Sequence, residues 1–559
     1  MPIELAKERP KRVFSAPGDE SNVIRRSLAE LVWRGAPKPR VLGKWFAYKG
    51  VSRSTATSTP SSPSLQEESE RANADIERSK AFISNSPPSS RTSPVGFRRL
   101  STSEIYENRI NLQHGETVHQ QTVRGRSDIH MPARPCSQAL LRHGFIWTSW
   151  IHFATHTETF ELEHDAAWES GLFLDGDPLW LAIYFGFIAM SLMFMTESEA
   201  FTARLPEVNT SDLIRNWYDA AIYFLNKADY LRNYNLRTVQ AIAILLGLGK
   251  SVGDFNSQPL LQATGIRIGQ IIGMDREPPL NGYALDDPVI QEVSRRTWWT
   301  LIICEWLSVP PRPPCIQEID FTVNIPLILT DKELSNIHLI PTSPFHPRQI
   351  EYHLALIAIA KTIYRFQYHL ARLGDDDTRI LEDLVLATDE DLATIIAQLP
   401  PHLSEARGSE PSNCNNDNND HSGWIAWQWR NLTLTLLIFR MRVNRCLQDR
   451  WPHMPDDNAL LARSKAICLE CATTVILLVD RNKNALSRHR PWAMTFYVFS
   501  AAMTLAIEVS SVPRVEAAEY IENIKLSLSF FEFLQDHSAL AKRANDVLLE
   551  FLRDIGLCI

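Results

Sequence analysis

From about residue 135 to residue 559, apolar residues recur at spacings of three and four, and this period constrains the fold more than any other feature. Such spacing places apolar side chains on one face of an α-helix. Clear examples are residues 222–231, 239–245, 356–366 and 432–443. We see no run of alternating apolar and polar residues between hairpin turns, the pattern typical of strands. The sequence therefore predicts an all-α body built from many helices.

The longest apolar stretch covers residues 180–195 and contains no charged residue. Sixteen residues are fewer than the ~20 that a membrane-spanning helix needs. We therefore predict a buried core helix here and expect no membrane partner. The eight cysteines, of which Cys136 is the first, are too sparse for a disulfide framework. They predict free thiols in a reducing, intracellular compartment.

The charge and composition of the first 135 residues differ from those of the remainder. Residues 1–135 hold 22 Lys and Arg against 14 Asp and Glu, a balance of +8, which leaves −16 for the rest. Residues 1–50 form a basic segment, and Ser, Thr and Pro crowd the stretch that follows. We predict a disordered linker over residues 51–135 and the all-α body over residues 136–559. A basic N-terminal region followed by an acidic body indicates an anionic partner such as DNA.

One stretch of the body is locally specific. The sequence Glu292-Val-Ser-Arg295-Arg296-Thr-Trp298-Trp299 opens a predicted helix, and a proline-rich turn follows it. The same motif continues after this helix with Arg312, Pro313, Asp320 and Pro326. Upstream, the predicted opening helix carries His152, His156 and Phe160.

These residues resemble the fungal-specific transcription factor domain, the regulatory middle region of fungal zinc-cluster regulators. The resemblance covers roughly residues 137–510 and implies an all-α regulatory domain that works in the nucleus. Two positions depart from the family pattern, because Pro311 stands for a glycine and Glu305 for an aspartate. A zinc cluster of this family needs six cysteines, and residues 1–135 contain none. We therefore expect no cofactor and no zinc cluster in this chain.

The residues of the central motif also have a purely physical interpretation. Trp298 and Trp299 face different neighbours on one helix, so the pair can anchor two helix packings. Arg295 and Arg296 can form ion pairs with Glu292 or with acids such as Asp320. We interpret these twelve motif residues as structural rather than catalytic, metal-binding or cofactor-binding. Direct contact of the arginines with a phosphate or another ligand is the alternative.

Three other patterns invite a chemical interpretation. His152 and His156 lie four residues apart on a predicted helix, a spacing that can hold a metal, yet structural histidines fit better because the zinc-protease glutamate is absent. Cys468 and Cys471 lie in an apolar helical run and indicate a core pattern. Glycines at 265, 269 and 273 follow no strand, so they predict close helix–helix approach rather than a dinucleotide site.

No catalytic constellation is assembled, so the sequence predicts a protein that is not an enzyme. Our first hypothesis is a nuclear transcription regulator of a metabolic gene set. It would contact DNA directly and weakly, or through a partner regulator, as a homodimer or heterodimer. The alternative is a scaffold that does not bind DNA and pairs with an intact zinc-cluster regulator.

Overall fold

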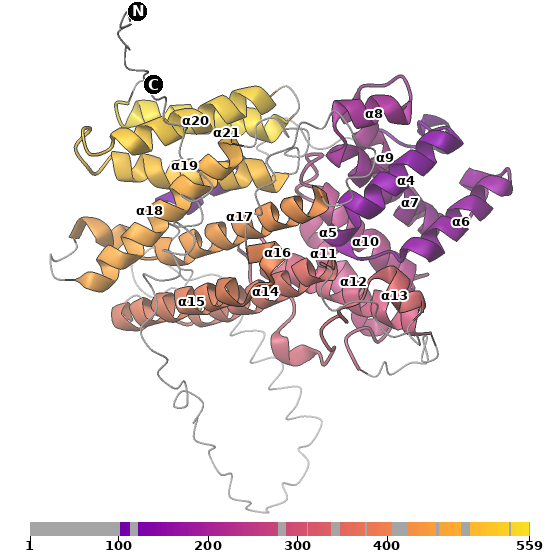
Figure 1. The fold of residues 1–559 in the computed structure, drawn as a ribbon, viewed down its shortest axis with the longest axis horizontal. Coiled ribbons are helices and arrows are strands. Elements are labelled where there is room, and N and C mark those ends of the chain that lie inside the picture. The colour runs from indigo at the N-terminus through magenta and orange to yellow at the C-terminus, as the bar shows by residue number, and fades with distance from the viewer. Residues whose placement is uncertain are drawn as a thin grey trace, which may run out of the picture. The chain divides into compact units, whose positions relative to one another are not determined.

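The protein folds as an all-α, multi-helix body, as the apolar spacing predicts (Figure 1). The computed structural model describes residues 101–111, 121–277, 287–309, 311–336, 347–374, 377–404, 423–453, 458–481, 492–535 and 538–557. Within these ranges the regular elements are α-helices and short 3-10 helices, with no strand. The predicted basic segment 1–50, and the predicted linker up to residue 100, lie outside the described residues.

The first group of helices surrounds α7, Pro178–Phe194, which packs against α4, α9 and α10. Its residues 179–194 are all buried, so the uncharged stretch is a core helix, as predicted. Asp177 caps this helix by accepting a hydrogen bond from the Leu179 N–H at 3.0 Å. The other helices of the group are α4 Arg134–Trp147, α5 Ser149–His152, α6 Thr157–Glu169, α8 Glu197–Ala203, α9 Thr210–Lys227, α10 Leu236–Leu248, α11 Gln258–Ile271, α12 Pro288–Trp306 and α13 Asp331–Ser335.

The remaining helices pack largely in chain order. They begin with α14, which lies against α12 and so joins the two groups. From there α15, α17, α18, α19 and α20 each pack against the helix before them (Figure 1). Their bounds are α14 Ile350–Leu370, α15 Thr378–Gln398, α16 Pro401–Ser404, α17 Gly423–Arg445, α18 Ala459–Asp480, α19 Trp492–Val509, α20 Ala518–Leu534 and α21 Ala539–Asp554.

The helix α19 is the one described helix that is both long and apolar enough to cross a membrane by length and composition. However, 78% of its 18-residue apolar window is buried inside the protein. It packs against α18, α20 and α21, which accounts for its apolar surface as helix–helix contact.

The predicted linker boundary at residue 135 is wrong for part of the segment, because residues 101–111 and 121–135 fold onto the body. The helix α3, Thr102–Asn111, packs against α19 and α21. Its Glu107 is 1% exposed and accepts hydrogen bonds from Arg445 at 2.6 Å and Arg442 at 3.1 Å. A buried ion pair, which composition cannot reveal, holds this polar helix in place.

The glycines of α11 permit the close helix approach that their spacing predicts. A Cβ atom at Gly265 would lie 2.9 Å from Ile242 on α10, and one at Gly269 would lie 2.9 Å from the Trp298 ring on α12. Gly273 has a φ of 82° and ends the helix, because this left-handed conformation suits glycine. The three glycines therefore bring α11 against α10 and α12 and then turn the chain.

We expect Gly269→Val to lower the free energy of unfolding by about 1–3 kcal/mol, the usual range for overpacking a core. The valine side chain would overlap the Trp298 ring, which is itself fully buried. The matched control is Gly374→Val at an exposed position where a Cβ meets only ordinary contact. Urea denaturation of both variants measures the difference, and equal midpoints would show that α11 can move away.

Candidate functional site

The central motif lies on α12, whose N-terminus is fixed by Pro288 and by the Asp287 cap. Asp287 accepts a hydrogen bond from the Val289 N–H at 2.9 Å. The helix carries the adjacent Trp298 and Trp299, which are 0% and 1% exposed. Both rings meet the Phe321 ring edge-to-face, with centroids 5.7 and 5.5 Å away. The tryptophan pair therefore anchors α12 to the segment that follows it, as well as to α11.

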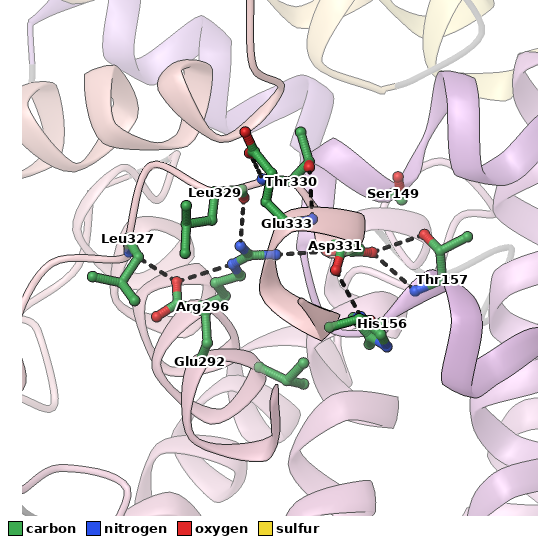
Figure 2. A network of polar contacts seen from close by, with 12 residues as sticks. Ser149, His156, Thr157, Glu292, Arg296, Leu327, Leu329, Thr330, Asp331 and Glu333 are labelled. Carbon is green, nitrogen blue, oxygen red and sulfur yellow. Dashed lines mark hydrogen bonds and ion pairs between the residues drawn. The ribbon is translucent and has the colours of Figure 1, made fainter. Parts of the chain in front are cut away.

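Glu292 and Arg296 form the centre of a buried polar network (Figure 2). Glu292 Oε1 accepts hydrogen bonds from Arg296 Nε at 3.0 Å and from the Leu327 N–H at 2.9 Å. Arg296 also donates through Nη1 to Asp331 Oδ1 at 2.8 Å and through Nη2 to the Leu329 carbonyl at 2.7 Å. Nη1 and Nη2 of this guanidinium group thus hold Asp331 and Leu329 against α12, while Nε binds Glu292 on the same helix.

Arg295 binds a second carboxylate, Glu277, in addition to Glu292. It donates through Nε to Glu277 Oε2 at 3.2 Å and also pairs with Glu292. Burial alone would raise the pKa of Glu277, but hydrogen bonds from Arg295 and from the Asn324 N–H bring its pKa below the usual value. The two adjacent arginines are therefore held by structural carboxylates, as predicted for Glu292.

Asp320, named above as an example of an acid that could pair with these arginines, forms a different contact. Asp320 is exposed and accepts a hydrogen bond from the Gln317 N–H at 2.7 Å, at the start of the 3-10 helix η3, Glu318–Asp320. The acid that meets Arg296 is Asp331, the first residue of α13. Sequence reasoning missed it, although Thr330 and Glu333 form a capping box that marks this helix start.

The motif residues Arg312, Pro313 and Pro326 do not join the network. Arg312 and Pro313 are exposed, whereas Pro326 is buried beside the strap of residues 327–331. Glu305, one of the two positions that depart from the motif described above, accepts a hydrogen bond from the Cys315 N–H at 2.7 Å. It therefore ties the end of α12 to the following loop.

His152 and His156 do not lie on one helix, so the predicted helical spacing is wrong. α5 ends at His152, Phe153 adopts the left-handed conformation with a φ of 45°, and α6 begins after His156. His152 Nδ1 accepts a hydrogen bond from the Ala154 N–H at 3.0 Å. His156 lies 3.2 Å from the Asp331 carbonyl through Nε2 (Figure 2). The two imidazoles thus shape a turn, and the described residues contain no cluster of three metal-ligating side chains.

Two buried histidines near this turn should make the stability of the protein depend on pH. Burial lowers the pKa of both His152 and His353 from 6.5 to about 3. The unfolded chain therefore binds protons below pH 6.5 that the folded chain cannot bind, so stability falls as the pH drops below 6.5. The expected loss is about 1.4 kcal/mol per pH unit for each histidine.

Denaturation by urea at pH 7.5 and pH 5.5 checks this expectation. The variant His353→Met removes one titrating group, so its stability should fall less between the two pH values than that of the wild type. A control is His369→Met on the exposed end of α14. An identical pH dependence in wild type and His353→Met would contradict the account.

Phe160, the last of the predicted motif residues, belongs to the wall of a cavity of about 650 Å³. Its ring is 4% exposed and lies 5.7 Å from the Trp180 ring, centroid to centroid. The wall is made by α6, α7, the N-terminal turns of α10 and α12, and residues 272–277, which follow α11. Arg295 and His156 also line it, so the cavity adjoins the Glu292–Arg296 network directly. The sequence pattern did not predict this cavity, because its wall comes from four separate helices.

The cysteine pair lies in the core, as predicted. Cys468 and Cys471 are both fully buried on α18, and the Cys468 thiol donates to the Met441 carbonyl at 3.6 Å. Burial raises the pKa of Cys471 to about 12, so its thiol stays protonated and unreactive at neutral pH.

The all-α fold is also found in a known structure. Over 81% of this chain and 88% of the other, it matches the K. lactis CBF3 core with a TM-score of 0.50 and 12% sequence identity. In sequence it is similar to the aurofusarin cluster transcription factor aurR2 of Gibberella zeae, with 30% identity over 124 residues. That match spans 22% of this chain and 18% of the relative's length. No family model matches the chain.

Proposed function

We propose that this chain is a fungal transcription regulator that acts in the nucleus through its all-α body. The observation that carries the proposal is the 30% identity to a fungal cluster transcription factor over 124 residues. The likeness of fold to the CBF3 core is consistent with it. The motif on α12 fits a structural role in such a body, since its charged side chains hold a strap and its tryptophans fill the core.

Charge separates the roles of the two parts of the chain. The body beyond residue 135 carries a balance of −16 and repels DNA phosphates, whereas residues 1–50 carry +6. Direct contact with DNA would therefore fall to the basic segment and be weak, with the ~10⁻⁴–10⁻⁶ M affinity of non-specific binding at physiological salt. Stronger attachment to a promoter would come through a partner regulator, in a homodimer or heterodimer.

A tethering assay tests the proposed function. The full chain is fused to a heterologous DNA-binding domain, and transcription of a reporter carrying the matching sites is measured in a fungal host. We expect a several-fold change in reporter transcript relative to the DNA-binding domain alone, upward for an activator and downward for a repressor. Expression that equals the control, at the same fusion protein level, would contradict the proposal.

The scaffold remains the second candidate, because residues 1–135 contain none of the six cysteines of a zinc cluster. Binding of the purified full chain to duplex DNA across a salt series distinguishes the two. A regulator that touches DNA through residues 1–50 should bind with a steep salt dependence. The scaffold predicts no binding even at low salt, together with an active tethered fusion.

A further inference from the structure

We propose that Ser101 is a phosphorylation site for a protein kinase that recognises basic residues, and that its phosphorylation releases the helix α3 from the body. The inference goes beyond the proposed function and does not depend on it, because the modification and the release are both measured on the purified chain.

The residues before Ser101 match the substrate pattern of such kinases. Arg98 and Arg99 stand three and two positions before Ser101 in the sequence. Kinases of this class bind two arginines at these positions in acidic pockets, so charge selects the acceptor hydroxyl group. The chain contains three Arg-Arg pairs, at residues 25–26, 98–99 and 295–296, and only the second is followed two positions later by a serine or threonine. The sequence therefore singles out Ser101.

In the structure, Ser101 caps the N-terminus of α3 through its hydroxyl group. Ser101 Oγ accepts a hydrogen bond from the Glu104 N–H at 3.3 Å and donates one to Glu104 Oε2 at 3.0 Å. The same carboxylate accepts a hydrogen bond from the Ser101 N–H at 2.9 Å. This reciprocal pattern is a capping box. The modification would therefore fall on a group that stabilises the start of the helix.

A phosphate group on Ser101 does not fit this arrangement. Ser101 is 7% exposed, and its phosphate ester lacks the hydroxyl proton that Glu104 accepts. The phosphate also adds a charge of about −1.5 to −2 beside the Glu104 carboxylate. Repulsion between the two groups and the loss of hydration both disfavour the docked helix. We therefore expect α3 to leave the body so that water can solvate the phosphate.

The arginines of the buried network at α3 are already bound to a carboxylate. Arg445 and Arg442 donate to Glu107 at 2.6 and 3.1 Å. Arg445 also donates to the Thr504 hydroxyl at 3.3 Å. Recruitment of either arginine to the phosphate would deprive the buried Glu107 carboxylate of that partner, which is costly. The phosphate is therefore expected to weaken the docking of α3 rather than to strengthen it.

Polar contacts hold α3 on the body, so its docking is sensitive to added charge. Between residues 102 and 110 the buried positions are Ser103, Glu107 and Ile110, and only the last is apolar. Ser103 donates to Gln448 Oε1 at 3.4 Å, and Glu107 forms the ion pairs described above. The helix packs against α21 and against α19, whose apolar window is largely buried. Release of α3 would therefore expose apolar surface on α19.

The transfer step needs MgATP and the kinase. Ser101 Oγ attacks the γ-phosphorus, the Oγ–P bond forms while the bond from that phosphorus to the β–γ bridging oxygen breaks, and ADP leaves. The hydroxyl proton passes to the catalytic aspartate of the kinase. Because this hydroxyl is buried while α3 is docked, the kinase reaches it only when α3 opens. The rate of phosphorylation should therefore follow the fraction of the chain in which α3 is open.

The first experiment tests the site. The purified full chain is incubated with MgATP and the catalytic subunit of cAMP-dependent protein kinase, and fragmentation mass spectrometry distinguishes Ser101 from the two hydroxyl residues that follow it. We expect phosphate on Ser101 and a rate at least about ten-fold lower in the variant with both Arg98→Ala and Arg99→Ala. The matched control replaces the other N-terminal pair, residues 25–26, and should keep the wild-type rate. An unmodified Ser101 would overturn the proposal, and so would equal rates in the two double variants.

The second experiment measures the release of α3. Amide hydrogen exchange is followed by mass spectrometry in the phosphorylated chain, the unmodified chain and the variant Ser101→Ala. We expect the α3 amides to exchange at least about ten-fold faster after phosphorylation, while those of α10 stay unchanged. Ser101→Ala removes the cap without adding charge, so its exchange should quicken less. Exchange of α3 that is unchanged or slower in the phosphorylated chain would refute the release.

A variant of the buried carboxylate links the two steps. Glu107→Gln weakens the ion pairs that hold α3 and should raise the rate of Ser101 phosphorylation several-fold. Tyr106→Ala, which removes a ring 5.1 Å from the Phe551 ring, is a second variant with the same expectation. Glu522→Gln on the exposed face of α20 is the control and should not change the rate. Circular dichroism checks that each variant is folded, and wild-type rates in both folded α3 variants would contradict the opening step.

Discussion

Trp298→Ala is expected to lower the free energy of unfolding by about 3–5 kcal/mol, the range measured when a buried aromatic site is emptied. The Trp298 ring is 0% exposed and fills the space that Gly269 leaves on α11, with Phe321 against its other side. Truncation would open a cavity at the contact of α11, α12 and the segment after α12. Neighbouring helices held by Trp299 and the polar network can close it only in part.

The measurement is a urea titration followed by circular dichroism, with Phe201→Ala as the matched aromatic control. Phe201 is 87% exposed on α8, so its truncation should leave the denaturation midpoint nearly unchanged. A midpoint for Trp298→Ala that equals the wild type would mean that the ring contributes no packing and that α12 is not anchored as described.

Glu292→Leu is expected to have an effect of similar size, about 3–5 kcal/mol, because it removes one member of a buried ion pair. Glu292 is 0% exposed and accepts from Arg295, Arg296 and the Leu327 N–H. Its loss leaves these N–H groups without an acceptor at a buried position, where water does not replace the carboxylate. The strap of residues 327–331 should loosen first, since Leu327 loses its backbone contact with α12.

A surface ion pair provides the comparison for this prediction. Glu522 pairs with Lys525 at 2.8 Å on α20 and its side chain is 70% exposed. Because exposed pairs contribute little, Glu522→Leu should unfold at nearly the wild-type urea concentration. If Glu292→Leu behaved like this surface variant, the α12 network would be a solvated feature with no role in holding the strap.

The helical class, the core position of α7 and the role of the tryptophan pair follow from local patterns in the sequence. Apolar residues at spacings of three and four identify the buried face of a helix. Two adjacent large aromatic residues indicate where that helix packs against its neighbours. The pairing of Arg295 and Arg296 with Glu292 was also predictable, because these residues lie three and four positions apart on one helix.

The features that could not be predicted depend on contacts between distant parts of the chain. Asp331 reaches Arg296 from 35 residues away, and Glu107 reaches Arg445 from 338 residues away. Asp331 rather than Asp320 meets Arg296, because proximity in the sequence does not fix the path of a loop. The left-handed turn at Phe153 broke a regular helical spacing, since a bulky residue rarely adopts this conformation. The cavity could not be predicted because its wall forms only when four separate helices come together in the folded protein.

The most direct test of the proposed function is a comparison of transcripts with and without this chain. The gene is deleted in the source organism, and messenger RNA is sequenced in the deletion strain, in the parent and in a strain complemented with the wild-type gene. The account predicts that a defined set of genes changes several-fold on deletion and returns to the parental level on complementation. Transcripts that are the same in all three strains, under conditions in which the parent makes the protein, would contradict it.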